Sequence, residues 1–152
     1  MKEGDVRMPE IIIPVGISNF KEIRQNGYYY VDKTGLIKTL LKTTGAKVTL
    51  ITRPRRFGKT LAMSMLANFF DIRKKSQNLF TGLQIESRPD LCQAWMNQFP
   101  TLFLTFKDVD GLDYASARDM LRSQIARLCN EHSYLADSPS VNENDRKEFI
   151  QL

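Results

Sequence analysis

The chain has 152 residues, of which 42% are hydrophobic and 26% charged, a composition that supports a folded core and argues against intrinsic disorder. Its net charge of +5 is uneven, because residues 1–76 carry 15 basic and 6 acidic residues, whereas residues 77–152 carry 7 and 11. No apolar run is long enough to span a membrane, and Cys92 and Cys129 fit no metal or disulfide pattern, so we expect a soluble, cytoplasmic chain.

The first part of the chain contains signals for short elements. Residues 1–10 are expected to form a tail, and a short helix is predicted at residues 20–24, before the turn signal Asn26-Gly27. The aromatic run at residues 28–31 has the composition of a strand. Asp32 is predicted to cap a helix that continues to about Lys42, because its apolar residues recur at the spacing of one helical face.

The clearest strand and the clearest helix follow. Residues 47–52, KVTLIT, are predicted to form a buried strand, and residues 59–70 a helix whose wide apolar stripe is typical of packing on a sheet. Further on we expect a helix near residues 89–96, a strand at residues 101–106 (TLFLTF), a helix from Asp113 to about Glu131 and a short C-terminal helix. This alternation predicts an α/β fold, with a parallel sheet flanked by helices.

The loop between the predicted strand and helix carries the chemistry. It reads RPRRFGKT over residues 53–60, which resembles the Walker A pattern except that Arg53 stands where the first glycine is usual. A helix N-terminus offers unpaired amides to phosphate oxygens, Gly58 permits a close backbone approach, Lys59 would reach the β- and γ-phosphates, and the Thr60 hydroxyl would hold Mg²⁺. The predicted nucleotide-binding residues are Arg55, Arg56, Phe57, Gly58, Lys59 and Thr60.

Four stretches of sequence resemble the bacterial AAA-ATPase-like family, whose full-length members usually also carry a C-terminal restriction-endonuclease-like domain. They are IPVGISNFKEIRQNGYYYVDKTGLI, KVTLITRPRRFGKTLAMSML, LFTGL and FPTLFLTFKDV, and they cover most of residues 11–135. The resemblance implies a P-loop NTPase fold with a pre-core segment at 11–46 and an incomplete P-loop core at 47–152. It also implies ATP and Mg²⁺ as cofactors. In the resembled family an arginine in place of the first Walker A glycine, as at Arg53, is familiar. Asp32-Lys33 resembles a segment that lies near the adenine in related ATPases.

The sequence lacks a convincing Walker B strand, which would present a carboxylate to Mg²⁺. Asp108 is a poor candidate, because Lys107 precedes it and no glutamate follows. In the resembled family the corresponding stretch, an aliphatic run that ends in Asp-Glu-Tyr-Asp, comes later than Leu152. We therefore expect a domain that is truncated before the Walker B strand and is unlikely to hydrolyse ATP by itself.

Three functions stay open at this point. The leading interpretation is a Mg-ATP-binding part of an ATPase that acts on nucleic acid or on a protein partner. The second is a nucleic-acid-binding module with a degenerate P-loop, in which Arg53, Arg55, Arg56 and Lys59 form a patch for the phosphate backbone. The third is a truncated product with no autonomous function. The sequence identifies neither the partner nor the oligomeric state.

Overall fold

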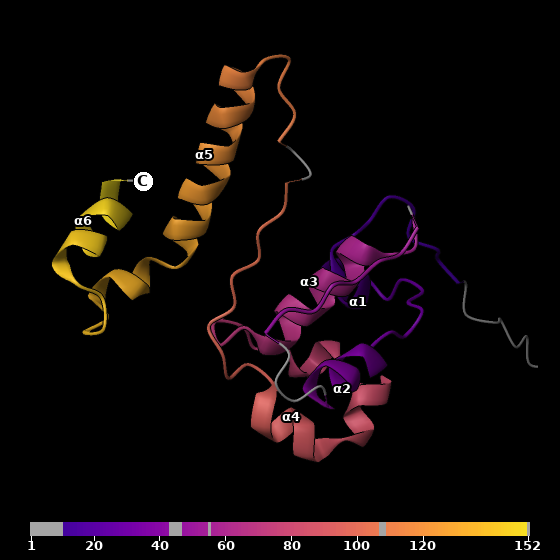
Figure 1. The fold of residues 1–152 in the computed structure, drawn as a ribbon. Coiled ribbons are helices and arrows are strands. Elements are labelled where there is room, and N and C mark those ends of the chain that lie inside the picture. The colour runs from indigo at the N-terminus through magenta and orange to yellow at the C-terminus, as the bar shows by residue number, and fades with distance from the viewer. Residues whose placement is uncertain (1–10, 43–46, 55, 107–108, 152) are drawn as a thin grey trace, which may run out of the picture. The chain divides into compact units, whose positions relative to one another are not determined.

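The computed structural model describes residues 11–42, 47–54, 56–106 and 109–151 (Figure 1). The chain divides into two compact units, Met1–Thr101 and Leu102–Leu152. The N-terminal unit contains α1 (Phe20–Gln25), α2 (Gly35–Lys42), α3 (Lys59–Phe70), the short 3₁₀ turns η1 (Gln77–Leu79) and η2 (Gln84–Ser87), and α4 (Pro89–Trp95). The C-terminal unit contains α5 (Tyr114–Glu131), η3 (Ser133–Asp137) and α6 (Glu143–Gln151).

The N-terminal unit is organised around α3, which contributes Met65, Leu66 and Phe69 to the hydrophobic core. Phe69 is completely buried, and its ring lies edge-on to that of Phe80 with the centroids 5.3 Å apart. Phe20 of α1 also packs against Phe80, with the ring centroids 5.0 Å apart. The complete cluster consists of Phe20, Ile37, Met65, Leu66, Phe69, Phe80, Leu83 and Ile85. The predicted helix at 59–70 is thus confirmed, but its apolar stripe packs against other helices and turns.

The helix that opens the N-terminal unit is held by polar contacts at both ends. The side chain of Asn19 caps α1 by accepting hydrogen bonds from the amides of Lys21 and Glu22. At the other end, the Arg24 guanidinium donates to the carbonyl oxygens of Leu79 and Thr81, each at 2.7 Å. These long-range bonds fix α1 to η1 and to the turn that follows it.

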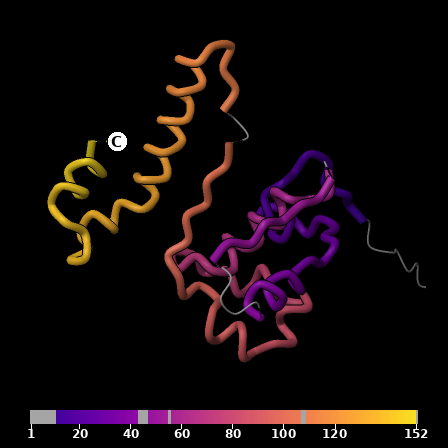
Figure 2. The backbone as a smooth tube through the Cα atoms, in the orientation of Figure 1, coloured from indigo at the N-terminus to yellow at the C-terminus, as the bar shows by residue number. Residues whose placement is uncertain are grey.

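The predicted α/β fold, a P-loop NTPase parallel sheet with flanking helices, is wrong. Within the described ranges no β-sheet forms, and the predicted strands at 28–31, 47–52 and 101–106 are extended coil (Figure 2). Val48 and Leu50 are 84% and 83% exposed, and Leu102 is 63% exposed. The composition favours a strand, but a strand also needs a neighbouring segment that pairs its backbone groups in a regular ladder. A single bond, from the Tyr29 amide to the Ile12 carbonyl at 2.8 Å, does not make such a ladder.

One parallel bridge joins Asp71, directly after α3, to Phe99, directly after α4. The amide of Ile72 donates to the Phe99 carbonyl at 2.9 Å, and the Phe99 amide donates to the Phe70 carbonyl at 3.0 Å. Between them, Asn97 has a left-handed backbone (φ 56°) and turns the chain back toward α3. This contact closes the end of the unit that lies opposite the start of α3.

The C-terminal unit has far less buried apolar surface. Asp113 caps α5 as predicted, because its carboxylate accepts a hydrogen bond from the Ser116 amide at 2.7 Å. The predicted inner row of this helix is only half-buried; it consists of Ala117, Leu121, Ile125 and Leu128. The arginines of the helix are exposed; they are Arg118, Arg122 and Arg127. None of the described helices combines the length and the apolar character needed to cross a membrane.

Candidate functional site

The loop before α3 contains two residues with a left-handed backbone. Gly58 has φ 73°, which glycine adopts freely, whereas Arg56 has φ 68°, which is unfavourable for a residue with a Cβ by about 1–2 kcal/mol. Backbone strain of this kind is often found at functional sites, so the left-handed Arg56, two residues before the left-handed Gly58, marks this loop as a candidate site.

The N-terminus of α3 is open to an anion. Gly58 is the N-cap and has no side chain that could satisfy the first amides, and the first turn contains no acidic residue. The helical bonding of α3 begins with the amide of Ala62, which donates to the Gly58 carbonyl at 2.9 Å. The earlier amides and the positive end of the helix dipole are thus available to a phosphate group.

Lys59, the first residue of α3, turns back over the loop. Its ammonium group donates a hydrogen bond to the Arg53 carbonyl at 2.5 Å. Because Lys59 and Arg53 are both exposed, this positive charge lies at the surface of the loop and is accessible to an anionic ligand. Arg53 therefore contributes a backbone acceptor to the loop, which any residue at that position could provide.

The structure brings together five of the six predicted nucleotide-binding residues, Arg56 to Thr60, at this helix start. The sixth, Arg55, lies outside the described residues. A Walker A loop is expected to lie between a strand and a helix. Here a helix follows the loop, but the described residues 47–54 before it form no strand. Asp108, the weak Walker B candidate, also lies outside the described residues, and the described part of the chain contains no cluster of three or more potential metal-ligating His, Cys, Asp or Glu residues.

A second lysine reaches the loop from a distant part of the sequence. Lys33, which precedes α2, donates a hydrogen bond from its ammonium group to the Phe57 carbonyl at 2.9 Å. The same nitrogen lies 3.0 Å from the point that a Cβ on Gly58 would occupy. Residue spacing gave no sign of this contact, because 24 positions separate Lys33 from Phe57 and the two residues share no local motif.

The backbone that carries Lys33 is fixed by its neighbours. One carboxylate oxygen of Asp32 accepts hydrogen bonds from the Thr34 amide at 2.8 Å and hydroxyl at 2.7 Å, and the other accepts from the Gln84 amide at 2.6 Å. Thr34 is completely buried, and its hydroxyl accepts a bond from the Ile85 amide at 3.2 Å. Lys33 therefore extends from an anchored segment between the loop and η2.

The carboxyls of Asp32 and Asp71 make the stability of the N-terminal unit depend on pH. Burial acts to raise the pKa of each carboxyl, but hydrogen bonds to the carboxylates outweigh it. Asp32 accepts these bonds from Gln84 and Thr34, and Asp71 accepts them from the backbone and guanidinium of Arg73. Both pKa values consequently lie below the ordinary 3.8. A depressed pKa stabilises the folded state above the unfolded pKa, and this contribution is lost as the pH falls through the folded pKa.

We therefore expect the urea midpoint of the N-terminal unit to fall as the pH decreases below about 4. Asp71→Asn should flatten part of this decline, because the asparagine cannot titrate. Asp119→Asn, at an exposed carboxyl of α5, is the matched control and should leave the decline unchanged. A wild-type midpoint that stays constant between about pH 5 and pH 3 would contradict the assignment.

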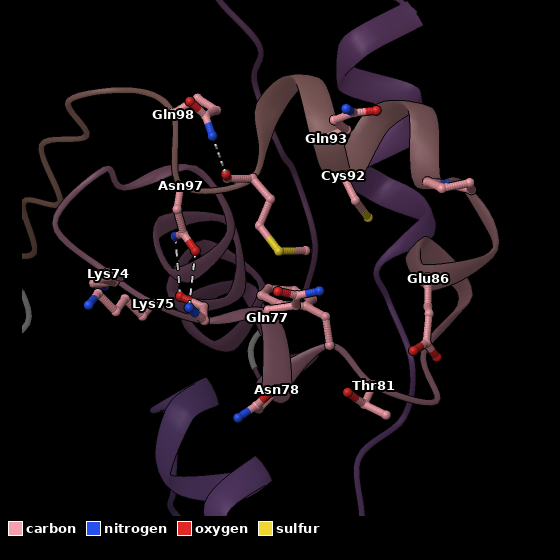
Figure 3. A pocket seen from close by; sticks show the side chains of 14 residues that line it. Lys74, Lys75, Gln77, Asn78, Thr81, Glu86, Cys92, Gln93, Asn97 and Gln98 are labelled. Carbon is pink, nitrogen blue, oxygen red and sulfur yellow. Dashed lines mark hydrogen bonds between the residues drawn. The ribbon is translucent and has the colours of Figure 1, made fainter.

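A second candidate site is a cavity of about 890 Å³ at the opposite end of the unit (Figure 3). Its labelled side chains come from the turn after α3, from η1 and the turn that follows it, from η2, and from α4 and the residues that follow α4. They are mainly amides and lysines. The complete lining comprises Lys74, Lys75, Ser76, Gln77, Asn78, Phe80, Thr81, Glu86, Pro89, Cys92, Gln93, Met96, Asn97 and Gln98.

This cavity shares no residue with the loop before α3. Burial, followed by the nearby charges of Asp90 and Glu86, raises the pKa of the Cys92 thiol, which keeps it protonated and poorly nucleophilic. The thiol also donates a weak hydrogen bond to the Ile85 carbonyl. The lining therefore offers polar contacts to a ligand but no activated nucleophile at this cysteine.

Comparison with known proteins gives one family and one relative. Residues 14–151 match the family model AAA-ATPase_like, described as Predicted AAA-ATPase. The chain is also 39% identical, over 141 residues, to a protein of Azotobacter chroococcum mcd 1 that is named an uncharacterized protein in the vnfD 5' region. That alignment covers 92% of this chain but only 25% of the relative, so the chain spans about a quarter of the relative's length. No solved structure matches the chain.

Proposed function

The chain belongs to the Predicted AAA-ATPase family, and from this we propose that it binds Mg-ATP through the loop before α3. The observation that carries the proposal is the open N-terminus of α3, with left-handed Gly58 as its N-cap and the Lys59 ammonium folded over the loop. Backbone amides of the first turn would donate hydrogen bonds to phosphate oxygens, and the Lys59 ammonium group would neutralise part of the phosphate charge.

The residues present fit the triphosphate better than they fit the metal ion. Thr60 is exposed at the second position of α3, where its hydroxyl could serve as one Mg²⁺ ligand. The usual second ligand is a carboxylate on another segment, and among the described residues no group of three or more His, Cys, Asp or Glu is placed to hold a metal ion. The proposed function is therefore nucleotide binding, with hydrolysis dependent on groups beyond this loop.

We assign this binding to a role within a longer ATPase that acts on nucleic acid or on a protein partner, because the similar Azotobacter protein is about four times as long as the matched region. The reducing cytoplasm is the compartment that suits the two cysteines, which are both free thiols. Both assignments go beyond the family and rest on the loop being a working nucleotide site.

The test is thermal unfolding with and without Mg-ATP, followed by the fluorescence of Trp95, the single tryptophan. A ligand that binds only the folded state stabilises it by about 2.7 kcal/mol at a hundredfold excess over its dissociation constant. We expect Mg-ATP to raise the midpoint of the wild type but not that of Lys59→Ala. Lys21→Ala, at an exposed lysine of α1, is the matched control and should keep the shift.

An equal shift in the wild type and in Lys59→Ala would refute the proposal, since ATP would then bind elsewhere. The competing nucleic-acid function has its own signature. The test for it is the binding of an unrelated single-stranded oligonucleotide. If this binding weakens steeply with salt and ATP does not displace the oligonucleotide, a phosphate-backbone patch is favoured over a nucleotide site.

A further inference from the structure

We infer that Lys33 is a second phosphate-binding lysine of this loop, so that the triphosphate of the nucleotide is held by Lys59 from α3 and by Lys33 from the segment before α2. The inference rests on the proposed function and deepens it, because it names a specific residue that recognises the phosphate chain. The Walker A pattern includes no residue outside residues 53–60, so the pattern does not assign this role.

The position of the Lys33 ammonium group carries the inference. It lies 2.9 Å from the Phe57 carbonyl oxygen and 3.0 Å from the point that a Cβ on Gly58 would occupy. The absence of a Cβ on Gly58 is what allows a phosphate group close to the backbone there. The ammonium group thus borders the same space as the proposed phosphate, and it has three N–H donors, of which the Phe57 carbonyl accepts one.

The segment that carries Lys33 is held in place before a ligand arrives. The three hydrogen bonds of Asp32 and the complete burial of Thr34 fix the backbone on both sides of Lys33. The side chain of Lys33 is exposed, and its ammonium group bonds the Phe57 carbonyl of the loop. An anchored backbone lowers the entropy lost when the ammonium group meets a ligand, which favours binding.

The charges of the loop support an anionic ligand between the two lysines. Lys33 and Lys59 both donate to backbone carbonyls of the loop, Phe57 and Arg53, and neither of these bonds goes to a carboxylate. A carbonyl oxygen satisfies a donor but does not neutralise its charge. A phosphate chain that approaches the loop would provide charged acceptors for both ammonium groups.

The experiment measures dissociation constants of Mg-ATP and of inorganic tripolyphosphate, which has no nucleoside, by calorimetric titration. Lys33→Met is expected to weaken both ligands about tenfold, because each loses a charge-assisted hydrogen bond. Lys38→Met removes the same charge from an exposed position of α2 and should leave both constants unchanged. Without ligand, the melting midpoints of the two variants should agree, which shows that Lys33→Met acts on binding and not on folding.

Three outcomes would overturn the inference. If Lys33→Met weakens Mg-ATP but not tripolyphosphate, Lys33 contacts the nucleoside and not the phosphates. If Lys59→Met weakens both ligands while Lys33→Met behaves like Lys38→Met, the inference fails but the proposed function stands. If the wild type binds neither ligand, the inference and the proposed function fail together.

Discussion

Replacement of Phe69 by alanine is expected to lower the free energy of unfolding of the N-terminal unit by about 3–5 kcal/mol. The ring is completely buried and contacts Phe80 and Phe70, with centroid distances of 5.3 Å and 5.1 Å. Its removal exchanges these contacts for a cavity at the centre of the core. Small domains have total stabilities of about 5–15 kcal/mol, so this one change would remove a large share.

Urea unfolding followed by Trp95 fluorescence measures this effect, because Trp95 stacks on Phe99 at 4.9 Å within the same unit and reports its integrity. Phe106→Ala is the control, since this ring is 61% exposed and its loss should change stability by less than about 0.5 kcal/mol. If both variants shift the midpoint equally, Phe69 is not at the centre of a packed core.

The second large effect is expected at Asn97, where alanine should cost about 3 kcal/mol. The Asn97 amide nitrogen donates to the carbonyls of Asn68 and Asp71, at 3.1 Å and 2.9 Å, and its oxygen accepts from the Ser76 amide at 3.0 Å. The alanine removes all three bonds and leaves the Ser76 amide without this acceptor, whereas the Asn68 and Asp71 carbonyls keep bonds from the Ser76 hydroxyl and the Lys74 amide. Alanine is also less favourable than asparagine on this left-handed backbone, because it lacks the polar side chain that makes asparagine tolerated there.

Comparison with Asn97→Gly separates the two causes, because glycine accepts the left-handed backbone but makes no side-chain bonds. We expect Asn97→Gly to be more stable than Asn97→Ala and less stable than the wild type in the same urea titration. A glycine variant as stable as the wild type would show that the hydrogen bonds contribute nothing, and that the backbone conformation alone determines the residue at this position.

The helices could be predicted from the sequence because their signals are local. The capping residue Asp113, the proline at the start of α4 and the apolar face of α3 each act within one or two turns, and the helices form where these signals lie. The sheet could not be predicted in the same way. Residues 47–52 have a β-branched composition, but a strand depends on a partner segment elsewhere in the chain, which local composition does not specify.

The candidate site shows the same division between local and distant information. Gly58, Lys59 and Thr60 are adjacent in the sequence, so their motif predicts a loop followed by a helix, and the helix is found. The approach of Lys33 to this loop and the closure of the unit by Asn97 depend on how the chain returns to α3. Both residues lie far in sequence from the groups they bind, and no short motif includes the pairs.

The exposed, extended course of residues 101–106 has a consequence for the lifetime of the protein in a cell. Proteases bind their substrates as extended chains, so a folded protein must usually open locally before it can be cut. Here the apolar side chains of Leu102, Phe103, Leu104 and Phe106 already face solvent in extended backbone, at the boundary between the two units. Turnover by cleavage at this segment would therefore proceed without unfolding of the core around Phe69, and mutations that stabilise that core would not slow it.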